Sequence, residues 1–243
     1  MEDNQNQEKE LNEKLDQEIK SEEQQKTTVN TEEIKNETAE TVKQVKESMK
    51  NVNVKEEAKA TKGFVGEMFK NPLEKIEEIA NDTTNKHFKT AIVLVIIWTI
   101  AALLGTISFK YFRWYNIGNT LLGYIKVILV PVLIVVVMSA IIYLMNKKTK
   151  RSLTTILTTV TAAKLPIIIA KVISLLSLFS YSITTITSRI TSFCSIISTV
   201  FMYFAIKSLY GEKEEKTAFK NFAIIEAIYI IAAFVIAYLG INI

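Results

Sequence analysis

Hydrophobic and polar positions divide the chain into two unlike parts near residue 90. From Ala91 onward, long apolar runs alternate with short polar or basic segments. Several runs reach the length of about 20 residues that a helix needs to cross a membrane. Before residue 61 the chain is built mainly from Glu, Lys, Gln, Asn and Thr, without Gly, Pro or aromatic residues. The pattern predicts an all-α, polytopic membrane protein with a polar N-terminal tail.

The apolar part, residues 90–243, predicts five transmembrane helices. We place these spans at about 91–109, 121–145, 153–179, 190–209 and 218–239. The third span lies in the longest run, because residues 152–188 carry no charge except Lys164 and Lys171. A helix over that whole run would measure about 55 Å, more than one upright crossing. Either one tilted helix continues into the interface, or the helix breaks near Pro166.

Residues 61–89 form a third kind of segment, in which apolar side chains recur every three or four positions. This spacing predicts an amphipathic juxtamembrane helix. Pro72 is placed either to break that helix or to open its second half. We interpret Phe64, Met68, Phe69 and Pro72 as candidate anchors that insert into the headgroup region. Packing of the same stripe against the chain's own spans is an equal alternative.

The tail, residues 1–60, has a composition that cannot bury enough apolar surface to offset the entropy of ordering it. We therefore expect a disordered or transiently helical tail. Helical spacing at 11–19 and at 42–52 amounts to about two heptads, which is a weak coiled-coil signal. The alternative is a helix that docks on a partner.

Charge follows the same division of the chain. Residues 1–89 carry 15 Lys and 21 acidic residues, whereas residues 90–243 carry 14 Lys and Arg and 4 Glu. The positive charges of the second part lie between apolar runs and form no single basic patch, which excludes nucleic acid as the main partner. They gather at alternate ends of the spans, so the positive-inside rule predicts a cytoplasmic N-terminus and a C-terminus outside. We expect a multi-pass integral protein of the cell membrane.

Charged side chains inside the predicted spans are the candidate polar and structural site. Lys164 and Lys171 lie seven residues apart, so they share one helix face, and Pro166 lies between them. Glu226 is the acidic residue of the fifth span. A charge at this depth is costly unless it is paired or hydrated. We hypothesise that Lys164 pairs with Glu226; the alternative is that each finds water or a lipid phosphate by itself.

Hydroxyl groups are frequent in the third and fourth spans, with 19 Ser and Thr in residues 152–199. Such groups bond to carbonyls of their own helix or of a neighbour, which favours a packing role over a polar substrate path. The chain has one histidine, His87, and one cysteine, Cys194, and it lacks a phosphate-binding glycine loop. We therefore predict no catalytic residues, metal site or cofactor.

Three short motifs carry a resemblance to a known family. They are FKNPLEKI at 69–76, Lys164-Leu-Pro166, and the Tyr210-Gly211-Glu212 turn that leads into TAFKNFA at 217–223. Over about residues 64–240 the chain resembles the Yip family, whose eukaryotic members bind Rab-type GTPases, and its residue bias resembles a bacterial member. The resemblance implies five membrane helices and a cytoplasmic N-terminus. The tail has no counterpart of the acidic-aromatic Gly-Pro stretch of eukaryotic members, so GTPase binding is not part of the expectation.

These features favour a non-enzymatic membrane scaffold or adaptor. Its helices contact the lipid bilayer, and its tail recruits other membrane or cytoplasmic proteins; a homo-oligomer is compatible with the same pattern. The alternative is a small transporter or channel component that uses the intramembrane Lys and Glu side chains and the hydroxyl-rich helices. Deleting the tail separates the two, because a scaffold loses its partners while a transporter keeps moving solute.

Overall fold

The computed structural model describes residues 32, 34–47, 54–111, 117–146, 151–179, 181–211 and 213–238. The chain divides into two units, Met1–Glu47 and Ser48–Ile243, and each is described by itself. In the first unit residues 34–47 are helical, and the Thr38 hydroxyl donates to the Ile34 carbonyl at 2.6 Å. Most of the predicted tail, and the basic loop residues 147, 148 and 150, lie outside the described residues.

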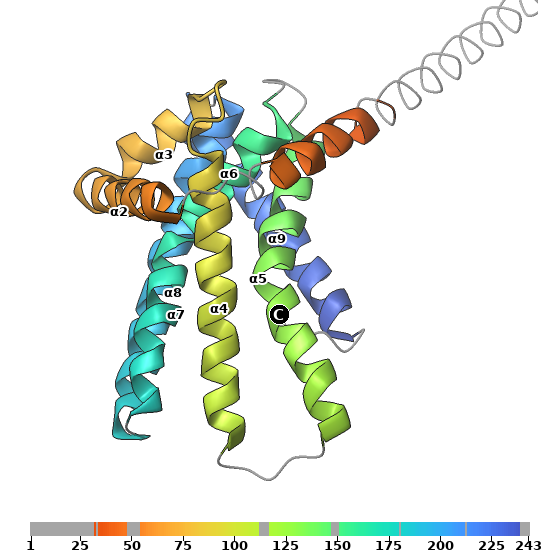
Figure 1. Ribbon diagram of the computed structural model, residues 1–243. Coiled ribbons are helices and arrows are strands. Elements are labelled where there is room, and N and C mark those ends of the chain that lie inside the picture. The colour runs from red at the N-terminus through yellow and green to blue at the C-terminus, as the bar shows by residue number, and fades with distance from the viewer. Residues whose placement is uncertain are drawn as a thin grey trace, which may run out of the picture. The chain divides into compact units, whose positions relative to one another are not determined.

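The second unit is built from α-helices and one 3-10 turn over its described residues, as the hydropathy pattern predicts. Two helices come before the predicted spans: α2 (Val54–Lys70) and α3 (Pro72–Asn81). The remaining elements are α4 (Phe88–Tyr111), α5 (Ile117–Met145), α6 (Leu153–Ala163), α7 (Leu165–Ser174), η1 (Leu175–Leu178), α8 (Tyr181–Tyr210) and α9 (Glu215–Tyr238). Figure 1 shows α2 and α3 lying across one end of the long helices, which we call the α3 end.

Four helices, α4, α5, α8 and α9, are each long and apolar enough to cross a membrane. The series α6–α7 reaches the same length and composition, but it is bent by 48° at Lys164. Counted over the described residues, this makes five crossings when the bent pair is taken as one span. The predicted all-α, multi-pass membrane fold is confirmed.

The hydroxyl-rich run 152–188 is shared between two crossings. Its first part breaks at Lys164, where Pro166 occupies the first turn of α7 and has no N–H to donate to the preceding turn. The next helix, α8, begins at Tyr181 and not near Ile190 as we expected. Because neither Gly nor Pro lies between those two positions, nothing delays the helix start. Arg189 consequently lies within α8, where we had expected a loop.

Helix ends at the α3 end are tied together by hydrogen bonds. The Ser152 side chain caps α6 by accepting the Thr155 N–H at 3.2 Å. The Thr155 hydroxyl in turn donates to the Asp82 carbonyl at 3.0 Å, and Arg151 donates to Asn81 Oδ1 at 2.5 Å. The start of α6 is thereby held against the end of α3.

The apolar core lies toward the same end. Fully buried side chains from four helices meet there: Ile76, Ile79, Met138, Ile142, Ile156, Val160, Met202, Ile206 and Leu209. Along the spans, by contrast, large apolar side chains such as Ile100, Leu129, Phe193 and Phe234 are exposed. In a bilayer these side chains contact lipid tails, which are as apolar as the side chains themselves.

Candidate functional site

A cavity of about 670 Å³ lies among α4, α5, α7, α8 and α9, partway along the spans. This volume lies within the range of about 300–1,000 Å³ that is usual for small-molecule sites. One wall is apolar and is formed mainly by Trp98, Ala101, Val127, Val130, Pro131 and Ile134. The rest of the lining is largely polar and comes from Lys164, Lys171, Ser174, Ser177, Ser195, Thr199, Glu226 and Tyr229.

Lys164 reaches this cavity because the helix bends at its position. Its N–H donates to the carbonyls of Val160 and Thr161 at 3.0 and 3.1 Å, and its own carbonyl accepts the Ile168 N–H at 3.1 Å. The backbone on both sides is therefore helical, while the side chain lines the cavity and is 8% exposed. The Nζ atom lies 5.9 Å from the centre of the Tyr229 ring, near the outer limit of a cation–π contact.

Glu226 enters the cavity from α9, one turn before Tyr229. Its carboxylate and the Lys164 ammonium attract each other across the cavity. Among the described residues, however, the ion pairs closer than 4.0 Å lie elsewhere and do not join these two side chains. The hypothesis of a direct ion pair is therefore corrected: the two charged groups line the same cavity and interact without a contact closer than 4.0 Å.

The other two candidate residues of the third span, Lys171 and Pro166, both lie on α7, but only Lys171 lines the cavity. Lys171 is half-buried and lines the same cavity about two turns beyond Lys164. Pro166 is half-buried beside the break, and it does not line the cavity in the described part of the chain. Three of the four candidate intramembrane residues thus meet at one place.

Ser198 of α8 closes the break from the neighbouring helix. Its hydroxyl, fully buried, donates to the Ala163 carbonyl at 2.9 Å. A bend in a membrane helix leaves carbonyls without their usual partners, and a neighbouring hydroxyl is one way to satisfy them. Other hydroxyls bond to carbonyls of their own helix four residues earlier, among them Thr158, Thr159, Thr161 and Thr191. Both modes expected of these residues are present.

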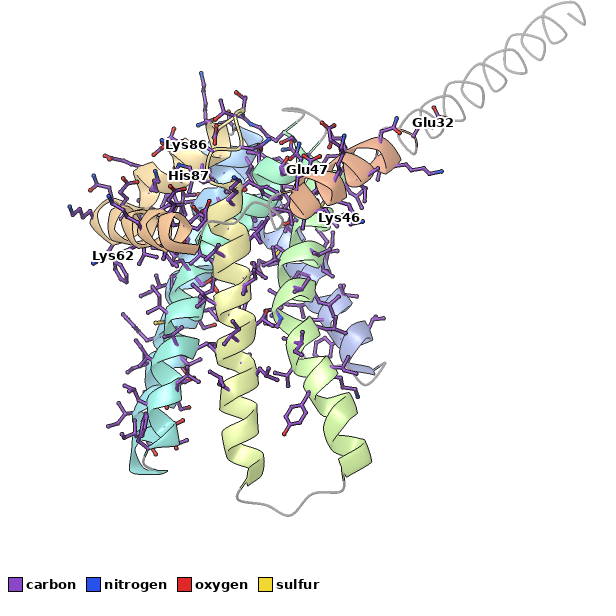
Figure 2. All side chains as sticks on the ribbon, viewed as in Figure 1. Glu32, Lys46, Glu47, Lys62, Lys86 and His87 are labelled. Atoms are coloured by element: carbon purple, nitrogen blue, oxygen red, sulfur yellow. The ribbon has the colours of Figure 1, made fainter. Side chains whose placement is uncertain are left out.

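A second charged cluster lies at the α3 end, before the first span. Lys75 of α3 is 6% exposed, and its Nζ donates to Glu67 Oε2 at 2.7 Å and to Glu78 Oε2 at 2.8 Å. It also lies 3.3 Å from His87 Nε2. The His87 ring packs against Phe64, with 5.5 Å between ring centres. We call these five residues the α2–α3 clip; Figure 2 labels His87 and Lys86 at this end of the bundle.

The environment of the clip shifts the pKa of its members in opposite directions. Burial alone lowers the pKa of Lys75, but its hydrogen bonds to Glu67 and Glu78 outweigh burial, so the pKa lies above 10.5. The hydrogen bond from Lys75 lowers the pKa of both Glu67 and Glu78 below 4.5. Burial, followed by the Lys75 charge, lowers the pKa of His87 below 6.5. His87 is therefore harder to protonate than a free imidazole, and its Nε2 lies between the Lys75 ammonium at 3.3 Å and Glu78 Oε1 at 3.4 Å.

The candidate interfacial anchors lie on two sides of α2 and α3. Phe64 and Met68 are 5% and 2% exposed and belong to the core. Phe69 is 69% exposed and faces away from it. Pro72 opens α3 directly after the interruption at Asn71. The apolar stripe therefore packs on the chain's own helices, and Phe69 is the anchor candidate that stays free to meet a headgroup layer.

Sequence reasoning missed the clip and the cavity's aromatic side chains. The interruption at Asn71 changes the phase of the helix, so that Lys75 shares a buried face with Ile76 and Ile79. One available signal was the spacing of Glu226 and Tyr229, three residues apart on one helix face. In the described ranges, no group of three or more His, Cys, Asp or Glu side chains is arranged to hold a metal ion.

Comparison with known proteins agrees with this architecture. The family model of the Yip1 domain matches residues 66–239, from the second half of α2 to the end of the last span. Neither the curated proteins nor the solved structures that were compared with the chain gave a match. Because the match covers most of the chain and every crossing found in the described residues, this multi-pass membrane protein belongs to the Yip family.

Proposed function

We propose that this protein is a non-enzymatic membrane scaffold or adaptor that recruits partner proteins through its N-terminal segment. The observation that carries the proposal is the division of the chain. A polar unit, Met1–Glu47, precedes a separate helical unit. Two amphipathic helices of that second unit, α2 and α3, are joined to each other by the clip and pack on the bundle through the apolar core. A recruiting segment at the membrane surface needs such a fixed attachment.

The proposal places the α3 end on the cytoplasmic side of the cell membrane. Basic residues near this end support it: Lys86, Lys89, Arg151, Lys207, Lys213, Lys216 and Lys220. With five crossings, the C-terminus then lies outside. Single cysteines test this orientation in a Cys194→Ser background. A membrane-impermeant maleimide should label Asn242→Cys in intact cells and should label Thr27→Cys only after lysis.

The partner test compares three chains cross-linked in membranes: the full chain, residues 48–243, and a chain whose first 47 residues are scrambled. The cut is made before Val54 because α2 belongs to the bundle. We expect the same proteins to be cross-linked to the full chain and lost from both variants, with equal expression and unchanged thermal stability. Recovery of the same proteins with the scrambled chain contradicts the proposal, since composition alone then explains the capture.

A second candidate function is that of a small transporter or channel component, and the cavity favours it. Lys164, Lys171 and Glu226 bring charge to the middle of the bundle, where charge usually marks a solute or proton path. Purified chain in liposomes should then move solute without its first 47 residues, and Glu226→Gln should abolish the flux. Flux that is unchanged by Glu226→Gln excludes a role for this cavity in transport.

A further inference from the structure

The cavity is lined by an ammonium group, that of Lys164, which donates no hydrogen bond within the described part of the chain. Lys164 is more than nine-tenths buried. Within the described part of the chain its Nζ lies 5.9 Å from the centre of the Tyr229 ring, and the Glu226 carboxylate attracts it without a direct ion pair. An ammonium group removed from water has three donors to satisfy and a large desolvation penalty. A polar occupant of the cavity would accept the hydrogen bonds that the Lys164 ammonium can donate.

The charges around the cavity indicate which polar occupant fits. Two ammonium groups, Lys164 and Lys171, face it together with one carboxylate, Glu226. The net positive charge favours an anionic group, and a phosphate oxygen accepts strong hydrogen bonds from lysine. Ser174 and Ser177 lie on the same element series as Lys171. Their hydroxyls donate to the carbonyls of Lys171 and Ser174 at 2.6 Å, so their oxygens are left to accept from a hydroxyl or amine of the occupant.

The apolar wall favours an occupant larger than a small inorganic anion, which would leave that wall without a contact. Trp98, Ala101, Val127, Val130 and Ile134 offer only apolar surface apart from the indole N–H. An occupant that contacts both walls must therefore carry a charged end and an apolar end. Phospholipids have this chemistry and surround the spans at high concentration.

We propose that the cavity binds a phospholipid, with its phosphate held by Lys164 and Lys171 and an acyl chain against the α4–α5 wall. A headgroup that carries a donor, either hydroxyl or amine, can place it on the Glu226 carboxylate. The site goes beyond the scaffold proposal and does not depend on the N-terminal segment. It gives the bundle a lipid ligand, held inside the protein and distinct from the lipids that coat its surface.

Trp98 is a built-in reporter for this site, because it lines the cavity and is 4% exposed. The chain has two tryptophans, so Trp114→Phe leaves Trp98 as the sole fluorophore. The full chain in detergent is titrated with phosphatidylglycerol whose acyl chains carry bromine, a contact quencher. Lipid that only coats the exterior does not touch Trp98. We expect saturable quenching, and at least tenfold weaker quenching by brominated diacylglycerol, which lacks the phosphate.

Matched variants locate the phosphate. Lys164→Gln and Lys171→Gln should each weaken lipid binding about tenfold, the loss expected for one charge-assisted hydrogen bond. Lys126→Gln removes a half-buried lysine of α5 that does not line the cavity, and it should change nothing. Gly105→Leu should block binding without loss of fold, because a Cβ at Gly105 meets nothing within 4 Å. If Lys164→Gln does not fold, the effects of Lys171→Gln and Gly105→Leu on lipid binding test the proposal.

Three outcomes overturn the proposal. Equal quenching by diacylglycerol means that the cavity recognises an acyl chain only. Competition by glycerol 3-phosphate at the lipid's own concentration means that the occupant is a soluble phosphate ester. Quenching that is absent, or that is reduced as much by Lys126→Gln as by Lys171→Gln, means that no phospholipid is held at this site.

Discussion

The ammonium of Lys75 lies 2.7 Å from the carboxylate of Glu67, and this contact joins α3 to α2 across the interruption at Asn71. The lysine is 7% exposed at its side chain, whereas Glu67 is 60% exposed. The pair is therefore asymmetric, because only the lysine has given up its water on folding. Removing the lysine and removing the glutamate should therefore change the free energy of unfolding by different amounts.

This asymmetry predicts unequal losses of stability for two sets of substitutions. Lys75→Met keeps the volume of the side chain and leaves Glu67 and Glu78 in solvent, so it should cost less than about 1 kcal/mol. Glu67→Gln combined with Glu78→Gln leaves a buried ammonium without a counter-charge, so it should cost about 3 kcal/mol. Unfolding of the detergent-solubilised chain measures both. Equal costs would show that the clip contributes through packing and not through charge.

The lowered pKa of His87 predicts a loss of stability in mild acid. Because the folded chain resists protonation of His87, the unfolded chain takes up this proton first as the pH falls through 6.5. The stabilisation is thus complete above pH 6.5 and declines below it. Glu67 and Glu78 contribute above pH 4.5 and lose their contribution only at lower pH, and Lys75 contributes below pH 10.5. The contributions of Glu67, Glu78 and Lys75 to stability therefore stay constant between pH 7.5 and pH 5.5.

The measurement is the melting temperature at pH 7.5 and at pH 5.5. It should fall for the native chain and stay nearly level for His87→Gln, which removes the chain's one histidine. A fall of equal size in both chains would assign the acid sensitivity to other groups.

The bond from Ser198 to the Ala163 carbonyl predicts a measurable contribution to the bend. Ser198→Ala should destabilise the bundle by about 0.6 kcal/mol, the mean for hydrogen bonds between membrane helices, with about 1.7 kcal/mol as the upper end. Ser192→Ala is the matched control, because Ser192 is exposed on the same helix and bonds to its own helix at Ser188. The two variants should differ in an unfolding titration; identical values would leave the bend stabilised by Pro166 alone.

The shared cavity of Lys164 and Glu226 predicts coupling without a direct ion pair. Glu226→Leu leaves two lysines facing the cavity, and it should destabilise the chain by about 2 kcal/mol. Lys164→Leu in the same chain should restore most of that loss, since an apolar pair of similar volume needs no counter-charge. Additive losses in this double-mutant cycle would show that the two groups are satisfied independently. Lys220→Gln, exposed on α9, is the neutral control.

Much of the fold could be predicted from the sequence, because hydropathy and the residues that begin or end helices act over short stretches of chain. Uninterrupted apolar runs were sufficient for α4, α5 and α9, and Pro72 and Pro166 marked the two places where helices restart. The start of α8 was misplaced because Arg189 was interpreted as a loop residue. A lysine or arginine near a span end can extend to the headgroups while its backbone stays helical, so charge alone does not end a membrane helix.

The sequence by itself determined that the second part of this chain crosses a membrane as helices. It also determined that Lys164, Lys171 and Glu226 need polar partners or water inside the membrane. The tertiary structure alone decided that these groups face one cavity beside Trp98 and Tyr229, and that Lys75 is buried against Glu67. The physical reason is the distance along the chain over which each kind of interaction acts. Helix periodicity orders neighbours within a few turns, whereas the meeting of α4, α7 and α9 depends on a 48° bend and on how each helix is rotated about its axis.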